Sequence, residues 1–536
     1  MSFEILRYFL MINFLNRLKF VLHNYKIFNK NNLDNQKNII LVEYNRLASS
    51  ILSYSYLSNV LQEKFRANIY AYRITAKKNS LKDLLWKILS KLYFFNTFHI
   101  YKSFGVNNFI CPNDLVLEKN DIKKINKIIK SIANKKDLLN LSIDNIYIGD
   151  LIYDSYLMNY KEATINFDNK DFNLYFKHSL ETFYKWKLVF KTYKVKSVIV
   201  SHTVYTLAIP LRIAVSKNIR AFQCSSQHLY SLSKKNIYAY KEFFEYKKRF
   251  SQLSTKIKNK TLKLAKIKIK NKFLGKDLAL GSTISAYKKK FTKRVIKQNH
   301  RIKILIATHC FFDNPHPYGK NLFVDFSEWL DFLGKVSKKT NYDWYLKLHP
   351  DYLLDTKKII DKFLKKYPNI NYIPNLVSHH QLIKEGIDVA LTCWGSIAHE
   401  YPLFNKLVVN ASVNNPHINY NFCLHPKTIK EYQKVLFNLN KYKNKINKKD
   451  IYEFYAMNFI LRKSWLLKNF NEIIKEKRYG YYFQFQSEFY NYWLKNEFNK
   501  FRHIDNLKKI SKFIESNNYL INWNKKELNE FLKKNA

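Results

Sequence analysis

The stretch WYLKLHPD occupies residues 344–351 and changes character halfway through. Its first three residues are large and apolar, which is typical of a buried strand. It then ends in Lys347, His349 and Pro350, which are a cation, an imidazole and a residue that restricts the following turn. Two interpretations are open. The stretch is either a strand end wetted by solvent or a site for something anionic.

Strand and helix signals alternate on both sides of this stretch. The segment KILIA at residues 303–307 predicts a preceding strand, and three short apolar runs predict later strands at 370–373, 389–391 and 407–410. Helical patterns lie between them at about 324–338, 356–367 and 378–385. This alternation predicts a Rossmann-like domain over residues 301–435.

The first half of the chain shows the same alternation. Strand signals at residues 37–43, 67–72, 198–202 and 219–223 alternate with helical patterns, which predicts a Rossmann-like domain over 31–231. We therefore expect an α/β protein with two Rossmann-like domains and additional C-terminal helices. The remaining predicted parts are an amphipathic segment at 1–30, a basic helical connector at 232–300 and a helical region at 436–536.

The charge of the chain is strongly basic, since 93 Lys and Arg against 41 Asp and Glu give 93 − 41 = +52. Such a charge favours nucleic acid or an anionic membrane surface as a partner. The lysines are spread along the whole chain, however, and no Arg-rich block, zinc knuckle or RNA-binding aromatic signature occurs. We favour a general compositional bias and expect no specific nucleic-acid partner.

The five cysteines include no CxxC pair, so neither a disulfide framework nor a zinc site is predicted, and a cytoplasmic setting is expected. Residues 1–30 are apolar but interrupted by Glu4, Arg7, Arg17 and Lys19. An uninterrupted spanning helix is therefore not expected. The segment is expected to lie on the inner face of the cytoplasmic membrane as an amphipathic helix, or to pack on the fold; both remain open.

Polar residues follow several strands of the second predicted sheet, where open α/β sheets bind ligands. In TCWGSIAHE (392–400), Gly395 and Ser396 open a helix whose free N–H groups favour a phosphate. Glu400 could accept a hydrogen bond from a ribose, or only stabilise the first turns of the helix. A plain serine cap is the alternative for Ser396. Together with Lys347, His349 and Pro350, these residues predict a nucleotide site.

The segment THCFFDNPHPYG (308–319) raises the question of a metal, because it carries His309, Asp313 and His316. Their spacing matches no compact ligand motif, and we expect either a structural, hydrogen-bonded loop or a loop that contacts a bound nucleotide or sugar acid. Neither GxxxxGK[ST] nor GxGxxG occurs in the chain. The prediction is therefore an enzyme without a metal or a separate cofactor.

The first predicted domain offers a second set of polar strand ends. Asp150 and Asp154 lie in IGDLIYDSYL, and four further residues are candidates for contacting a second substrate, the acceptor: Glu43, His202, Tyr205 and His228.

The His349-Pro350 pair and the Gly395, Ser396 and Glu400 pattern resemble GT-B glycosyltransferases of bacterial surface and capsular polysaccharide biosynthesis. Within that class the HP pair is similar to sialyltransferases and Kdo transferases, which use CMP-linked acid sugars. The stretches YSYLSNVL, IGDLIYDSYL, ATHCFFDNPHPYG and DWYLKLHP look like surface carbohydrate biosynthesis proteins. The resemblance covers roughly residues 38–430.

The resemblance implies roles for individual residues. His349 would hydrogen-bond the donor phosphate or ribose, Ser396 would bind the phosphate, and Glu400 would lie near the nucleoside. An acidic residue of the first domain would act as general base, and Asp150 and Asp154 match best. The sialyltransferase base lies in an acidic-acidic-Gly motif, whereas this chain has Gly149-Asp150.

The predicted function is therefore transfer of a sugar from a nucleotide-activated donor, with a CMP-linked acid sugar favoured, to a glycan or lipid-linked glycan acceptor. One alternative is a CDP-polyol phosphotransferase or another nucleotide-sugar enzyme, such as an epimerase. The other is a noncatalytic protein that binds membranes or polyanions.

Overall fold

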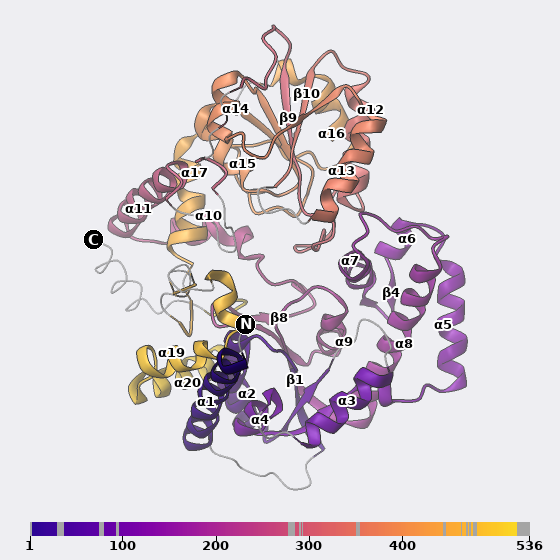
Figure 1. Cartoon of the computed structure of the whole chain (residues 1–536), viewed down its shortest axis with the longest axis vertical. Helices are drawn as coiled ribbons and strands as arrows, with labels where there is room; N and C mark the ends of the chain where they lie inside the picture. The colour runs from indigo at the N-terminus through magenta and orange to yellow at the C-terminus, as the bar shows by residue number, and fades with distance from the viewer. Residues whose placement is uncertain are drawn as a thin grey trace. The chain divides into compact units, whose positions relative to one another are not determined.

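The computed structural model in Figure 1 describes residues 3–28, 37–73, 80–92, 96–276, 285–288, 291, 293–349, 354–442, 446–462, 464–467, 470, 473–474 and 480–521. The chain forms two compact units. Unit 1 contains residues up to Ser155, then Phe167–Ala239, and then the described residues after Arg462. Unit 2 contains Tyr156–Asn166 and Tyr240–Arg462.

Unit 1 is built on a six-stranded sheet with the order β3-β2-β1-β6-β7-β8. All neighbouring strands are parallel except β7 and β8, which are antiparallel. The strands are β1 (Asn38–Glu43), β2 (Asn68–Tyr72), β3 (Val106–Ile110), β6 (Lys194–Val200), β7 (Arg220–Cys224) and β8 (Leu229–Leu232). A separate two-stranded hairpin consists of β4 (Ser142–Ile143) and β5 (Ile146–Tyr147).

Helices of unit 1 come from both ends of the chain. They are α1 (Phe3–Ile27), α2 (Ala48–Phe65), α3 (Ser80–Lys91), α4 (Thr97–Ser103), α5 (Lys119–Ser131), α6 (Lys135–Leu139), α7 (Gly149–Tyr160, which begins in this unit), α8 (Lys170–Thr192), α9 (Ile209–Ser216), α19 (Glu488–Asn496) and α20 (Lys500–Glu515). One apolar core joins α1, α2, the sheet, α19 and α20.

The N-terminal helix packs on the fold over its second half. Phe20 and Val21 are buried in the core, and the Phe20 ring stacks on Tyr490 of α19 at 4.3 Å. The interpretation of residues 1–30 as a segment packed on the fold therefore holds for this half. Among the described residues, no helix combines the length and apolar character needed to cross a bilayer.

Unit 2 is built on a five-stranded, wholly parallel sheet with the order β11-β10-β9-β12-β13. Its strands are β9 (Lys303–Ala307), β10 (Asp343–Lys347), β11 (Ile370–Ile373), β12 (Val389–Thr392) and β13 (Leu407–Asn410). Its helices are α10 (Tyr246–Ser251), α11 (Thr255–Phe273), α12 (Phe326–Ser337), α13 (Leu354–Lys366), α14 (His379–Glu385), α15 (Ile397–Glu400), α16 (Ile429–Phe437) and α17 (Lys448–Tyr455).

The five parallel strands of each sheet share the chain order 3-2-1-4-5, which is the doubly wound arrangement. The prediction of an α/β fold with two Rossmann-like domains and additional C-terminal helices is confirmed. The structure divides the chain differently from the predicted boundaries. Residues from Tyr240 onward belong to unit 2, where α11 packs on α17, and α19 and α20 belong to unit 1.

Candidate functional site

The candidate site in unit 2 lies where the strand order reverses. β9 is the central strand, β10 follows on one side and β12 lies on the other, so the loops after β9 and β12 diverge. In doubly wound sheets this divergence creates a crevice outside the carboxyl ends of the strands. Thr308 and His309 follow β9, and Cys393 to Gly395 follow β12.

His309 connects these two loops. Its Nε2 lies 3.0 Å from Thr392 Oγ1 and accepts a hydrogen bond from the Cys393 N–H at 3.3 Å. Because Nε2 is an acceptor, the ring proton is assigned to Nδ1. Burial, and secondly the nearby His349, lower the pKa of His309 to about 3. The ring is therefore neutral at pH 7 and can donate from Nδ1.

The backbone must come very close at Gly395. Its N–H donates to Thr392 Oγ1 at 3.0 Å. A Cβ at this position would lie 2.7 Å from that oxygen and 3.4 Å from His309 Cε1. The turn after β12 therefore requires glycine, and the absence of a side chain leaves the His309 ring edge uncovered by residue 395.

Lys347, the last residue of β10, and His349, two residues later, have different environments. The Lys347 side chain is buried, and its Nζ donates to the carbonyls of Pro374 and Asn375 at 3.4 Å each. His349 is exposed and close enough to His309 to affect its charge. The structure thus brings together His309, Lys347, His349 and Gly395 of the predicted donor site. Pro350 lies outside the described residues.

Ser396 is exposed and lies at the start of α15, a helix of a single turn. Its side chain makes no capping hydrogen bond, so the plain serine cap is not what the structure shows. A 3₁₀ turn over Tyr401–Phe404 follows directly. Such a short helix contributes little macrodipole, and the Gly395 N–H is already bonded to Thr392 Oγ1, so the exposed residue Ser396 is the better basis for a phosphate contact.

Glu400 is buried and already has partners for both carboxylate oxygens. Lys272 of α11 forms an ion pair with Oε1, and the Tyr287 hydroxyl donates to Oε2 at 2.7 Å. Burial would raise the pKa of Glu400, but the charge of Lys272 outweighs it and holds the pKa below its usual range. The carboxylate therefore ties α11 to α15, and the ribose role stays a prediction.

The two remaining candidates on the loop after β9, Asp313 and His316, differ in burial. Asp313 is exposed, whereas His316 is buried and accepts a hydrogen bond at its carbonyl from the Gly319 N–H. Asn321 Nδ2 donates to the Pro315 carbonyl at 2.7 Å and closes the loop. Within the described parts of the chain, no group of three or more His, Cys, Asp or Glu residues could hold a metal ion.

The corresponding edge of unit 1 contains a carboxylate that is fully engaged. Glu43 ends β1, and its Oε2 accepts from the Ser201 N–H at 2.6 Å and from the Ser201 hydroxyl at 2.8 Å. Asn45 Nδ2 donates to Oε1 at 3.0 Å. Glu43 therefore fastens the exits of β1 and β6 to each other.

The other candidates for the acceptor lie on loops of unit 1. His202 follows Ser201 and is exposed. Tyr205 is half-buried with a φ of 63°, which is left-handed backbone and strained for a residue with a side chain. His228 is half-buried and its N–H donates to Ser225 Oγ at 3.1 Å.

The predicted general bases both lie on α7 and are buried. Arg212 Nη2 donates to Asp150 Oδ2 at 2.8 Å, and the Tyr238 hydroxyl donates to the same oxygen at 2.7 Å. The Leu151 N–H donates to Oδ1 at 2.9 Å. Asp150 is therefore held as the anion of a buried ion pair. Asp154 lies one turn later and is equally buried.

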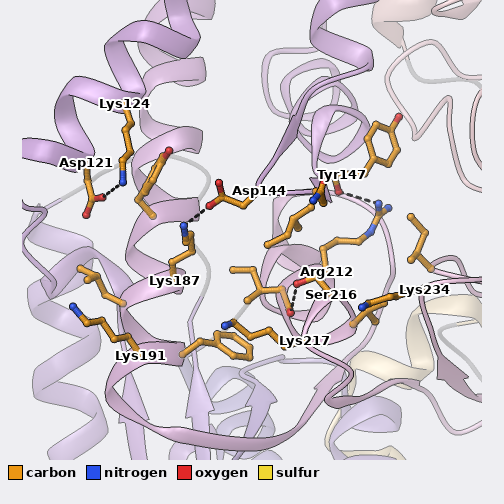
Figure 2. A pocket seen from close by; sticks show the side chains of 18 of the residues that line it. Asp121, Lys124, Asp144, Tyr147, Lys187, Lys191, Arg212, Ser216, Lys217 and Lys234 are labelled. Carbon is orange, nitrogen blue, oxygen red and sulfur yellow. Dashed lines mark hydrogen bonds and ion pairs between the residues drawn. The ribbon is translucent and has the colours of Figure 1, made fainter.

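A separate pocket of about 970 Å³ lies in unit 1 between α5, the β4–β5 hairpin, α8 and α9 (Figure 2). It adjoins the ends of α8 and α9 that lead into β6 and β7, away from the carboxyl ends of those strands. Its wall carries six cations, which are Lys124, Lys187, Lys191, Arg212, Lys217 and Lys234. Lys191, Lys217 and Lys234 are exposed lysines of a lysine-rich chain, so the charge of the pocket does not single out a ligand.

Several residues beside the candidate site were not predicted. His379, which starts α14, has its Nδ1 2.8 Å from the Tyr401 hydroxyl, and burial lowers its pKa to about 3. Lys272 and Tyr287 reach Glu400 from 128 and 113 residues away. Thr392, by contrast, is found by the strand-end rule, because it opens TCWGSIAHE at the end of β12. No local signal could have found Lys272.

No known family profile matches this chain, and no curated protein sequence matches it. Several solved structures align with most of it. One is a UDP-GlcNAc 2-epimerase from Neisseria meningitidis bound to UDP-GlcNAc, at 12% identity over 79% of this chain and 99% of that chain, with a TM-score of 0.23.

Another is a putative UDP-N-acetylglucosamine 2-epimerase from Listeria monocytogenes, at 10% identity over 80% of this chain and 96% of that chain, with a TM-score of 0.25. A third is a glycosyltransferase from Rickettsia africae, at 10% identity over 86% and 100%, with a TM-score of 0.21. At these TM-scores the alignments carry no argument about fold or chemistry. Those arguments rest on the sheets and side chains of this chain.

Proposed function

We propose that this protein is a glycosyltransferase that uses a nucleotide-activated sugar. The observation that carries the proposal is the cluster at the switch point of the unit 2 sheet, where His309, His349 and Ser396 lie after β9, β10 and β12. Donors of this kind suit a phosphate, since each offers an N–H without adding negative charge.

The charges of the residues around the site support a diphosphate or phosphodiester leaving group. Lys347 is a buried cation behind the loop, His309 is a neutral donor, and the acid at Glu400 is neutralised by Lys272. The buried carboxylate of Glu400 is therefore compensated by Lys272 and would not repel the departing phosphate. Stabilising the charge that develops there lowers the barrier to transfer.

Unit 1 would bind the acceptor hydroxyl. Asp150 is a poor general base as placed, because two donors and Arg212 already stabilise its charge. We assign the proton-accepting role to His202 instead. Its ring is exposed at the exit of β6, next to Ser201, which Glu43 holds in position. An imidazole is the side chain that most often accepts a proton in general base catalysis.

The finer proposal is a CMP-linked acid sugar as donor, a surface glycan as product and catalysis without a metal. It rests on the resemblance of the HP pair to enzymes of that class. A thermal-shift panel of CMP, UDP, GDP and ADP, each with and without EDTA, tests both levels. Stabilisation by CMP alone supports the finer proposal, stabilisation by another nucleotide only the coarser one. No stabilisation at millimolar concentration contradicts both.

Turnover distinguishes transfer from the alternatives. Incubation with each activated sugar and an acceptor should release the nucleotide only when the acceptor is present. Epimerisation of UDP-GlcNAc without an acceptor, or release of CMP from CDP-glycerol, would instead identify one of the alternative enzymes. His202→Ala should abolish transfer with the fold intact, whereas Asp150→Asn should mainly lower stability.

A further inference from the structure

Helix α3 presents its apolar side to solvent. Its apolar residues lie at the i, i+3, i+4, i+7 and i+8 spacing of one helical face, and that face continues to the residue just after the helix. All of them are between 42% and 66% exposed: Leu81, Leu84, Leu85, Ile88, Leu89 and Leu92. By contrast, α12 in unit 2 buries its apolar side through Phe326, Trp329 and Leu333.

The orientation of α3 is fixed by the other side of the helix. Asp83 is buried, pairs with Arg73 at 3.1 Å and accepts from Asn113 Nδ2 at 3.0 Å. Trp86 is buried among aromatic rings, with Tyr44 at 5.8 Å and Phe98 at 5.4 Å. Specific contacts therefore hold the leucine side outward, and this side has no covering element among the described residues.

We propose that this face of α3 lies on an anionic membrane surface. A contiguous exposed apolar stripe marks an interaction surface, and the charges around it choose the partner. Lys82, Lys87 and Lys91 are exposed along its borders, whereas its one acid, Asp83, points inward. Leucines that enter the acyl boundary with lysines at the headgroups are the pattern of an interfacial helix.

The position of α3 relates the membrane contact to the carboxyl edge of the unit 1 sheet. Trp86 packs on Tyr44, the residue after Glu43, so α3 borders the carboxyl edge of the unit 1 sheet beside β1 (Figure 1). A lipid-linked acceptor held in the same membrane would meet this edge without leaving the bilayer. Only this statement about the acceptor rests on the proposed function, because the membrane contact itself requires no activity.

Vesicle co-sedimentation of the full chain tests the contact. Vesicles of phosphatidylglycerol and phosphatidylethanolamine should bind the protein, and the combined Leu85→Ser, Ile88→Ser and Leu89→Ser variant should weaken the partition by about tenfold or more. The Lys82→Glu and Lys91→Glu variant should weaken it by about fivefold or more on these vesicles, because each basic residue near such a surface adds attraction.

Two matched controls locate the surface. Leu174→Ser removes an equally exposed leucine from α8, and Leu15→Ser with Leu22→Ser removes exposed leucines from α1. Both should bind vesicles like the unchanged chain. If the α1 variant loses binding and the α3 variant does not, the N-terminal helix is the membrane contact and the proposal for α3 is overturned.

Further outcomes would also overturn it. Equal vesicle binding by all variants would show that α3 is not the contact. A lipid-free dimer that the triple serine variant dissociates would show that a second copy covers the face. The thermal midpoint of that variant should change little, since the three side chains are already 42–48% exposed. With a soluble acceptor fragment its turnover should also be unchanged, which separates this proposal from failure of the proposed function.

Discussion

The carboxyl edges of the two sheets share a strand order but differ in how their ionisable groups are used. In unit 1, Glu43 at the edge and Asp150 on α7 are both buried, and their carboxylates form hydrogen bonds and an ion pair within the unit. In unit 2, His349 and Ser396 are exposed beside the neutral His309. At the first edge Glu43 holds the exits of β1 and β6 together, whereas the second edge leaves His349 and Ser396 exposed.

Breaking the Asp150 ion pair should have the largest effect. Arg212→Met leaves a buried carboxylate without its cation, and we expect a loss of about 3–5 kcal/mol in the free energy of unfolding. Urea denaturation measures this loss. Lys191→Met in the wall of the same pocket should cost less than about 0.5 kcal/mol, since Lys191 is exposed. Equal costs for both variants would show that this pair does not stabilise unit 1.

Acid should weaken unit 2 through His399, whose ring is buried with Nδ1 2.8 Å from His417 Nε2. Burial lowers the pKa of His399 to about 3, although Glu400 opposes the shift. Between pH 3 and about 6.5 the unfolded chain binds more protons than the folded one, so stability falls as pH falls. From pH 7 to pH 5 this histidine should account for a loss of about 2 kcal/mol.

The measurement is the free energy of urea unfolding at pH 5 and pH 7. His399→Phe keeps an aromatic ring against Phe454 and Tyr455 but cannot titrate, so its pH dependence should be flatter. His300→Gln changes an exposed histidine and should leave the pH dependence as it is. A slope that survives His399→Phe would assign the acid sensitivity to other groups.

Gly395→Ala tests whether the turn after β12 matters for stability and for nucleotide binding. The new Cβ would meet Thr392 Oγ1, which must move and give up its contact with His309. Because a hydroxyl can rotate, we expect a loss near the lower end for overpacking, about 1 kcal/mol, together with weaker nucleotide binding. Ser396→Ala, one residue on, should leave stability unchanged. Calorimetric titration with nucleotide should show weaker binding for Gly395→Ala than for Ser396→Ala.

The smallest effect on stability is expected at His349. Because the ring is exposed, His349→Ala should change the free energy of unfolding by less than about 0.5 kcal/mol. Loss of one hydrogen bond to a phosphate should nevertheless weaken nucleotide affinity by about tenfold or more. His300→Ala is the matched exposed control. An affinity that His349→Ala leaves unaltered would contradict the donor site.

The sheets could be predicted from the sequence because each buried parallel strand is a short apolar run with a polar exit. KILIA became β9 and DWYLK became β10, with the predicted helices between the later strands. The nearness of His309, Lys347 and Gly395 followed from the same rule, since parallel strands end at one edge.

The partners of the carboxylates could not be predicted. Arg212 lies 62 residues from Asp150, and Lys272 lies 128 residues from Glu400. Such pairs depend on how helices pack on the sheets, and no local pattern encodes that packing. Asp150 and Glu400 therefore carried the same sequence signal as a catalytic or ligand-binding acid, although the structure shows both neutralised by cations.

Unit 1 is built from chain segments that lie before and after unit 2, and this determines the order in which the two units can fold during synthesis. Its core joins Phe20, which precedes unit 2 in the chain, to Tyr490, Trp493 and Phe513, which follow it. Unit 2 needs no later residue than Arg462 among those described. A growing chain can thus fold unit 2 before unit 1. Until the later residues are made, the apolar core of unit 1 stays incomplete and exposed. Chaperone occupancy during synthesis should therefore concentrate on the half of the protein that is made earliest.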